Sequence, residues 1–395
     1  MNERIFRYLS EKTGSRGLSL VASYGIRFCM DTALTLTALF AGRMKPAEGA
    51  RELVEGLCKK PEASGVFAPL QPGNKDIDLS VIVPAYNAGK YIAQCIDSIL
   101  NQKTAYRLEV IAVNDDSTDD TLEILKGYGD RIRVIDFKDG HCAARSRNKG
   151  LLYATGKYVM FVDADDTLTE DCVEKLLNEA YKKDADVVQG SWRYLYEDGS
   201  LGGTQVYRDV TYTGKDRQSC FDLPGMPWGK VFKRELFSNV RFPENYKAFE
   251  DTIVQFAIFR KASVITSISD VIYCWRKTTT GITATSQNTS RAFQSYWIVE
   301  EMIDANDNVW KLPRDKEFMY CLASQLSNYC YVNVRGLDEE KKRAVFTLCR
   351  ELYEKNADDE LIKEIPFFAG KGAYALKTGK FALWKLQGEL SRFLR

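Results

Sequence analysis

Histidine is almost absent from this 395-residue chain, which contains only His141. A zinc site built from several histidines is therefore excluded, and a Ser-His-Asp relay would have to use that single residue. A charge excess is absent as well, because 55 Lys and Arg residues face 54 Asp and Glu residues, for a formal net charge of +1. Proteins that coat nucleic acid usually carry a basic excess, so we expect no nucleic-acid partner.

Cysteine pairs at metal-binding spacing are also missing. The nearest two of the ten cysteines, Cys321 and Cys330, are nine residues apart. Most of the others lie in apolar runs, where a thiol acts as a small hydrophobe. Since the sequence starts without a signal-peptide pattern, we expect reduced thiols and a cytoplasmic location.

No hydrophobic run is long enough for a membrane span, which needs about 20 mostly apolar residues. The best candidate, residues 18–42, is interrupted by Arg27 and Asp31, and its longest charge-free stretch has 11 residues. We predict a pair of amphipathic or buried helices there. Near the other end, residues 371–395 combine six basic residues and one acidic residue with interleaved aromatics. This pattern predicts either peripheral contact with an anionic membrane or a helix that closes its own domain.

The chain does contain enough apolar material for a large core, since 45% of its residues are hydrophobic. From residue 79 to residue 182, short β-branched runs alternate with helical patterns. This alternation is typical of βαβ units, and it predicts an α/β fold with a mostly parallel sheet covered by helices on both faces. We expect three parts: a helical N-terminal extension and linker (1–75), an α/β domain (76–290, with halves 76–200 and 201–290) and a helical C-terminal domain (291–395).

Two acidic clusters follow strands of this predicted sheet. Asp163 and Asp165 come directly after the strand pattern at residues 158–162, and Asp115 follows the one at residues 108–113. The carboxyl ends of parallel strands meet at one edge of a sheet, where ligands bind. Two carboxylates spaced i and i+2 suit a hard cation such as Mg²⁺ or Mn²⁺. Each cluster by itself is also consistent with an acidic helix cap.

A basic segment next to the third predicted strand favours the cation site over the helix cap as the interpretation of the acidic clusters. It contains Arg145, Arg147 and Lys149. Two neighbouring acidic clusters repel each other unless cations or hydrogen-bond donors lie between them. Acidic groups that can hold a metal, together with basic groups that can hold phosphate, indicate a nucleotide diphosphate as ligand.

Five segments of the chain then carry a resemblance to a known family. They are residues 81–87 (VIVPAYN), 97–102 (DSILNQ), 113–121 (VNDDSTDDT), 147–151 (RNKGL) and 161–166 (FVDADD). In order and spacing they resemble glycosyltransferase family 2, over about residues 78–290. The resemblance implies a GT-A fold, a nucleotide-sugar donor (with uridine diphosphate as the expected nucleotide), a divalent metal and inversion at the anomeric carbon.

The resemblance also assigns donor-side roles. The nucleobase loop corresponds to Pro84, Ala85, Tyr86 and Asn87. Asp115 corresponds to the acid that holds the base or ribose, and Arg147 to the basic residue near the nucleotide. The Asp-x-Asp motif corresponds to Asp163, Ala164 and Asp165, with Asp165 as the expected direct metal ligand. Because the family usually has small residues where this chain has Arg145 and Ser146, either arginine could face the phosphates.

The acceptor side follows from three further segments. Glu250 and Asp251 resemble the family's Glu-Asp motif, in which the Asp is the catalytic base, although both residues also favour a helix N-terminus. Residues 226–234 (MPWGKVFKR) resemble a Trp-x-Lys segment of bacterial polysaccharide transferases, so Trp228 and Lys230 are acceptor-side candidates, although Trp228 is equally consistent with a core aromatic. Arg276, with residues 281–283, resembles a segment that closes over the donor pyrophosphate.

These features together predict an inverting glycosyltransferase. Its expected acceptor is a hydroxyl of a cell-surface polysaccharide, a teichoic acid or a lipid-linked glycan. The alternatives are a sugar-1-phosphate nucleotidyltransferase, which should carry a Gly-rich phosphate loop after the first strand, and a non-catalytic nucleotide-sugar scaffold. A dehydrogenase is disfavoured because no Gly-x-Gly-x-x-Gly follows the first strand. The sequence leaves the sugar, the linkage and the oligomeric state open.

Overall fold

The computed structural model describes residues 16–63, 68–138, 142–214, 217–278 and 290–393. The chain forms two compact units. The α/β unit consists of residues 61–285 and 302–312, and the helical unit consists of residues 1–60, 286–301 and 313–395. The chain therefore passes between the two units several times.

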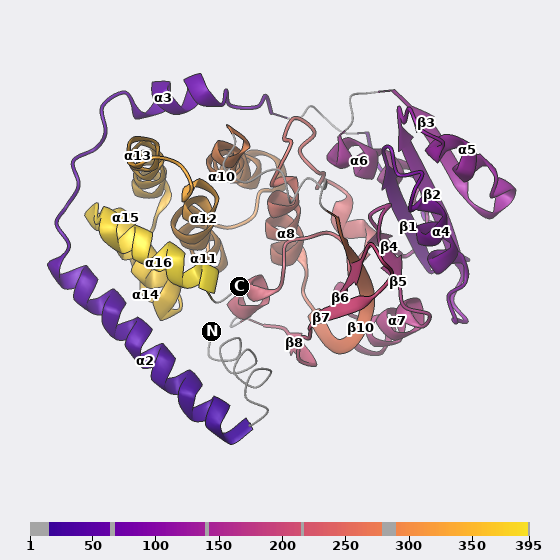
Figure 1. Cartoon of the computed structure of the whole chain (residues 1–395), viewed down its shortest axis with the longest axis horizontal. Helices are drawn as coiled ribbons and strands as arrows, with labels where there is room; N and C mark the ends of the chain where they lie inside the picture. The colour runs from indigo at the N-terminus through magenta and orange to yellow at the C-terminus, as the bar shows by residue number, and fades with distance from the viewer. Residues whose placement is uncertain (1–15, 64–67, 139–141, 215–216, 279–289, 394–395) are drawn as a thin grey trace. The chain divides into compact units, whose positions relative to one another are not determined.

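The α/β unit is built on one mixed sheet, drawn as arrows in Figure 1. Its strands are β1 (Leu79–Ala85), β2 (Leu108–Asp115), β3 (Arg133–Phe137), β4 (Tyr158–Phe161), β5 (Thr167–Leu168), β6 (Val187–Tyr196), β7 (Leu201–Gln205), β8 (Val210–Tyr212), β9 (Lys230–Lys233) and β10 (Ile265–Lys277). The order is β3-β2-β1-β4-β9-β6-β10-β5, with β7 beside β6 and β8 beside β10. Strands β1 to β4 are mutually parallel, as are β6 and β10, whereas β9 is antiparallel to both of its neighbours.

Helices cover both faces of this sheet. The α-helices are α4 (Ile92–Leu100), α5 (Thr121–Lys126), α6 (Ala143–Tyr153), α7 (Cys172–Lys183) and α8 (Glu250–Lys261), with shorter 3₁₀ turns η1 (Gly129–Arg131), η2 (Gln218–Asp222) and η3 (Arg234–Phe237) and the π-helical turn η5 (Asn306–Trp310).

Strand β1 explains this two-sided burial. Successive side chains of a strand point to opposite faces. Val81 and Val83 belong to the core cluster that includes α4, whereas Ile82 meets α6, where a Cβ on Gly150 would lie 2.4 Å from its side chain. Apolar residues at consecutive positions of β1 are therefore all fully buried.

The predicted fold class is confirmed, with corrections in the second half of the sheet. The sequence also predicts a single strand over residues 203–212, but the structure has two short strands there, β7 and β8. Strands β5 and β9 were not predicted at all. They have two and four residues, and β9 contains Lys230 and Lys233, so neither gives a readable apolar pattern.

The helical unit joins helices from both ends of the chain. Its elements are α2 (Arg16–Phe40), α3 (Ala50–Leu57), η4 (Ser290–Phe293), most of α10 (Gln294–Ala305), α11 (Lys316–Ser324), η6 (Gln325–Tyr329), α12 (Cys330–Val334), α13 (Glu339–Asn356), α14 (Asp359–Lys363), α15 (Phe367–Thr378) and α16 (Phe381–Phe393). The Met44 amide donates to the Gly379 carbonyl at 2.8 Å, and the Ala47 amide donates to Thr347 Oγ1 at 3.0 Å. Residues before and after the α/β unit thus complete one helical core.

Two expectations about the ends of the chain can be compared with this unit. The predicted pair of helices at residues 18–42 is wrong, because α2 is one continuous helix that buries Met30, Leu34 and Ala38 on a single face. Within the described parts of the chain, no helix combines the length and apolar character needed to cross a membrane. In the tail, Leu383 and Trp384 are fully buried, as expected for a helix that closes its own domain.

Candidate active site

The loops after β1 and β2 are bonded to each other at the carboxyl edge of the sheet. The Asn87 amide donates to Ser117 Oγ at 3.0 Å, and Asn87 Oδ1 accepts from the Thr118 amide at 2.8 Å. Asn87 has a positive φ of 48°, a conformation that Asn tolerates better than most residues. Pro84 and Ala85 end β1, and the next residue, Tyr86, is 44% exposed. The predicted nucleobase loop therefore lies beside the acidic loop of β2 with an accessible ring.

Asp115 ends β2 and is almost completely buried. Its Oδ2 accepts from the Cys142 amide at 2.7 Å. Its Oδ1 is buried and has no hydrogen-bond partner in the described part of the chain. A buried acceptor without a partner costs free energy, so this oxygen is suited to accept a hydrogen bond from a ligand. His141, next to Cys142, lies outside the described residues.

Arg147 on α6 connects the two predicted halves of the site. Its Nη2 donates to Asp163 Oδ1 at 2.9 Å, and its Nη1 donates to Glu250 Oε1 at 3.0 Å. The side chain is only 6% exposed. Burial alone would lower the pKa of this guanidinium, but the charges of Asp163 and Glu250 outweigh burial and raise the pKa above its ordinary value. Arg145, by contrast, pairs with Glu244 at 3.5 Å. Arg147 is therefore the arginine that pairs with the predicted site residues Asp163 and Glu250.

The Asp-x-Asp segment follows β4 and is held by β10. The Asp163 amide donates to Tyr273 Oη at 3.1 Å, and Ala164 is buried. Burial, together with the neighbouring charge of Asp163, raises the pKa of Asp165 to about 6. A cation between these two carboxylates would favour their charged forms.

Asp166 is a residue whose role the sequence did not reveal. Its Oδ2 accepts from the Tyr273 hydroxyl and its Oδ1 from the Arg276 amide, both at 2.6 Å. Arg276 in turn donates from Nε to the Asp165 carbonyl at 2.5 Å and from Nη2 to Gln94 Oε1 at 2.8 Å. Arg276 is 4% exposed, and in this conformation its side chain stabilises the Asp-x-Asp segment through the Asp165 carbonyl. The residues 281–283 that were grouped with it lie outside the described residues.

The predicted base lies in the first turn of α8. Glu250 is the first residue of this helix and Asp251 the second. Burial and the adjacent Glu250 charge raise the pKa of Asp251 to about 7, against the opposing effects of Arg147 and Lys230. A carboxylate with a pKa near the working pH is matched to general-base catalysis.

Lys230 and Trp228, the other predicted acceptor-side residues, are both buried. Lys230 is 1% exposed, and its Nζ donates to the Met226 carbonyl at 2.5 Å. Burial lowers the pKa of this ammonium to about 7, although the charge of Asp251 opposes the shift. Trp228 is 5% exposed and stacks on Tyr273, with 4.6 Å between ring centroids. Both side chains therefore face the protein interior.

A divalent metal would have to use few protein ligands. No group of three or more His, Cys, Asp or Glu side chains suited to a metal occurs in the described part of the chain. Two carboxylates, Asp163 and Asp165, are nevertheless a sufficient protein contribution for Mg²⁺ or Mn²⁺, which complete their coordination with water and substrate phosphates. The donor set fits such an ion.

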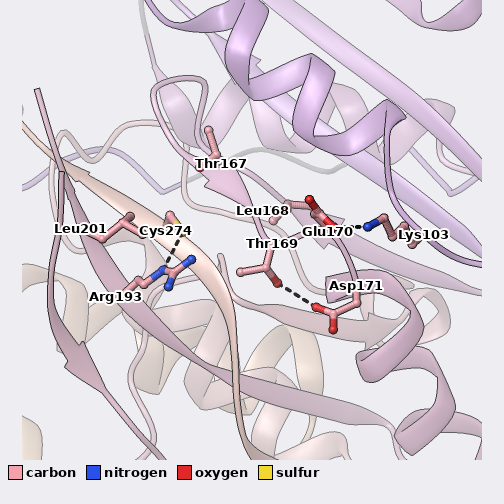
Figure 2. A pocket seen from close by; sticks show the side chains of 9 residues that line it. All are labelled: Lys103, Thr167, Leu168, Thr169, Glu170, Asp171, Arg193, Leu201 and Cys274. Carbon is pink, nitrogen blue, oxygen red and sulfur yellow. Dashed lines mark hydrogen bonds and ion pairs between the residues drawn. The ribbon is translucent and has the colours of Figure 1, made fainter. Parts of the chain in front are cut away.

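A separate cavity lies at the β5 edge of the sheet. Figure 2 shows its lining, which encloses about 620 Å³. Lys103 forms an ion pair with Glu170 there, and Arg193 on β6 donates to Cys274 Sγ on β10 at 3.4 Å. None of the predicted site residues lines this cavity, so we place the candidate active site at the open strand ends and not in the cavity.

Comparison with known proteins shows the class to which this chain belongs. The family described as Glycosyl transferase family 2 matches residues 80–241. The chain is 33% identical over 232 residues to glycosyltransferase GlyG of Streptococcus pneumoniae serotype 4, a match that covers 54% of this chain and 75% of GlyG. The chain therefore belongs to glycosyltransferase family 2 and is a glycosyltransferase. The predicted family and enzyme class are confirmed.

Other relatives are longer or more distant. The minor teichoic acid biosynthesis protein GgaB of Bacillus subtilis is 26% identical over 327 residues, which is 77% of this chain but only 35% of GgaB. Among solved structures, residues 1–349 of S. aureus TarS in complex with UDP-GlcNAc share the fold with a TM-score of 0.62 and 20% identity. That match covers 80% of this chain and 92% of the solved one.

Proposed function

We propose that this glycosyltransferase moves a sugar, with inversion, from a uridine-diphosphate donor to a hydroxyl of a cell-surface polysaccharide, teichoic acid or lipid-linked glycan. The observation that carries the proposal is the Arg147 bridge. The Arg147 guanidinium donates to Asp163 of the Asp-x-Asp segment and to Glu250 of α8 at the same time, so these two carboxylates lie close together. Donor-side and acceptor-side groups of an inverting transfer need this proximity, because the hydroxyl attacks opposite the leaving nucleotide.

Known relatives support the choice of substrates. TarS, which shares the fold, has been solved with UDP-GlcNAc and with UDP. GgaB is named for teichoic acid biosynthesis, and a 29% identical relative is named poly(ribitol-phosphate) beta-glucosyltransferase. These names favour a uridine nucleotide and an envelope polymer.

The donor binds, in this proposal, at the ends of β1 and β2. The exposed ring of Tyr86 packs on the nucleobase, within the loop formed by Pro84, Ala85 and Asn87. Asp115 Oδ1, which has no partner within the described residues, accepts a hydrogen bond from the base or ribose. Asp163 and Asp165 would hold Mn²⁺ or Mg²⁺. When bound, that ion supplies electrostatic stabilisation of the leaving nucleotide.

Asp251 is the general base. As the acceptor oxygen forms its bond to the anomeric carbon, the hydroxyl proton passes to the Asp251 carboxylate. The bond from the anomeric carbon to the phosphate oxygen breaks, and its electron pair leaves with the nucleoside diphosphate. Glu250 and Arg147 orient the first turn of α8 and so position Asp251. Lys230 opposes the rise in the pKa of Asp251, which keeps more of the base in its carboxylate form.

A donor screen tests the proposal. Nucleotide sugars are compared by thermal shift and by slow hydrolysis without acceptor, each with and without Mn²⁺. We expect uridine-diphosphate sugars to stabilise the protein in a Mn²⁺-dependent manner and to be hydrolysed. Stabilisation by a guanosine or cytidine nucleotide sugar alone would refute the donor assignment.

A further inference from the structure

One face of β6 and β10 carries a row of aromatic rings that the proposed reaction does not use. Trp192, Tyr194 and Tyr196 occupy alternate positions of β6, and Tyr273 and Trp275 lie opposite the first two on β10. Because side chains alternate between the faces of a strand, all five share one face. Ring centroids of Tyr194 and Trp275 are 5.4 Å apart, and those of Tyr194 and Tyr196 are 6.3 Å apart.

The inner end of this aromatic row lies at the reaction centre. Trp228 stacks on Tyr273 and lies nearly parallel to Trp275, at 6.0 Å between centroids. The Tyr273 hydroxyl bonds to Asp166, next to the Asp-x-Asp segment. Trp228 is also two residues from Lys230, whose ammonium interacts electrostatically with Asp251. The row therefore starts at the Asp-x-Asp segment, and Trp228 connects it along the chain to Lys230.

The outer end of the row is accessible. Tyr273 is fully buried, Trp192, Tyr194 and Trp275 are half-buried, and Tyr196 is 36% exposed. Glycines of the neighbouring strand β7 lie against these rings. A Cβ on Gly202 would lie 2.3 Å from the Tyr196 ring, so only glycine fits there without a shift. The backbone of β7 thus supports Tyr196 while part of the ring stays open to solvent.

We propose that Tyr194, Tyr196 and Trp275 form a platform that binds pyranose rings of the acceptor glycan. The proposal rests on the proposed function, which it extends by naming ring-bearing sugars as the acceptor class. The C–H face of a pyranose packs on a flat aromatic ring, and Tyr and Trp offer that area with little loss of conformational entropy. From Tyr194 to Tyr196 the platform extends about 7 Å along β6 at roughly 3.3 Å per residue, and Trp275 extends it across to β10.

The surroundings of the platform favour a glycan over an apolar partner. The exposed Lys277 places its ammonium 5.4 Å from the Tyr194 ring centroid, where it can pair with an anionic substituent of the sugar. The tyrosine hydroxyls add donors and acceptors beside the ring faces.

An oligosaccharide array followed by titration tests the platform. The full-length protein is applied to bacterial envelope oligosaccharides of several pyranose units and to ring-free poly(ribitol phosphate), and the strongest pyranose ligand is titrated into variants. We expect Tyr196→Ala to weaken its binding by about tenfold and to raise the acceptor KM with little change in kcat. Tyr196→Phe keeps the ring and should retain most of the affinity. Tyr374→Ala, which removes a comparably exposed ring of the helical unit, should not change it.

Any of four outcomes would overturn the platform. The first three are that the wild-type protein binds no pyranose oligosaccharide, that it prefers the ring-free polymer, or that Tyr196→Ala binds pyranose oligosaccharides like the wild type. A change of oligomeric state in Tyr196→Ala, measured by size-exclusion chromatography, would identify the row as a contact between copies. Failure of the proposed function is separate, since it appears as absent hydrolysis of uridine-diphosphate sugars by the wild-type enzyme.

Discussion

Replacement of Arg147 by methionine tests the bridge at the centre of the site. The guanidinium donates at 2.9 Å to Asp163 and at 3.0 Å to Glu250, and only 6% of the side chain is exposed. Removing one member of a buried ion pair typically costs about 3–5 kcal/mol, because the remaining charges lose their partner. For a unit of this size, each kcal/mol lowers Tm by about 2–4 °C. We therefore expect Arg147→Met to lower Tm by roughly 6–20 °C.

Arg145→Met provides a matched control on the same helix. Arg145 pairs with Glu244 at 3.5 Å, and the two side chains are 24% and 27% exposed. Pairs with this solvent access contribute about 1 kcal/mol or less. Urea unfolding followed by tryptophan fluorescence, with thermal melts beside it, compares the two variants with the wild type. Equal losses of stability in both variants would refute the argument that Arg147 is the buried bridge.

The base, the pH response and the metal give three further predictions. Asp251→Asn should lower kcat by about 10²- to 10⁴-fold and Glu250→Gln by less, with donor affinity unchanged in calorimetry; near wild-type turnover in Asp251→Asn would assign the base to another residue. If Asp251 is the proposed base, it acts in its carboxylate form; since its pKa is raised to about 7, kcat/KM should fall as pH drops through 7. Lys230→Met removes a charge that lowers the pKa of Asp251, so the decrease in kcat/KM should occur at higher pH. An unshifted pH profile would contradict the electrostatic interaction between Lys230 and Asp251. Asp165→Ala should abolish Mn²⁺-dependent binding of uridine diphosphate with little change in far-UV circular dichroism, and unchanged affinity would rule out the metal assignment.

The first half of the sheet was predictable because its signals are local. Buried parallel strands such as β1 need apolar residues at every position, and helices between them need apolar residues at helical spacing. The position of Asp115, Asp163 and Asp165 at one edge of the sheet was predictable for a related reason: each follows a buried strand, and the carboxyl ends of parallel strands meet at the same edge. Order along the chain was sufficient for these residues.

The rest of the site depends on contacts between distant segments. Sequence spacing could not separate Arg145 from Arg147, since they differ only in the face of α6 on which they lie. Burial of Lys230 follows from its position on β9, a strand too short to give a pattern. Tyr273 reaches Asp166 across 107 residues of sequence, and no local signal marks such a pair.

The helical unit also has a consequence for synthesis on the ribosome. Ala47 and its partner Thr347 are separated by 300 residues, so the first helices leave the ribosome long before the helices that cover them. At about 5–20 residues per second, translation of that interval takes roughly 15–60 s. During this time the apolar face of α2 that contains Met30 and Leu34 has no native partner, whereas the α/β unit between them can already fold. The nascent chain would therefore present an early binding site for chaperones, and ribosome-bound chains of increasing length should lose that binding only after α13 to α16 have emerged.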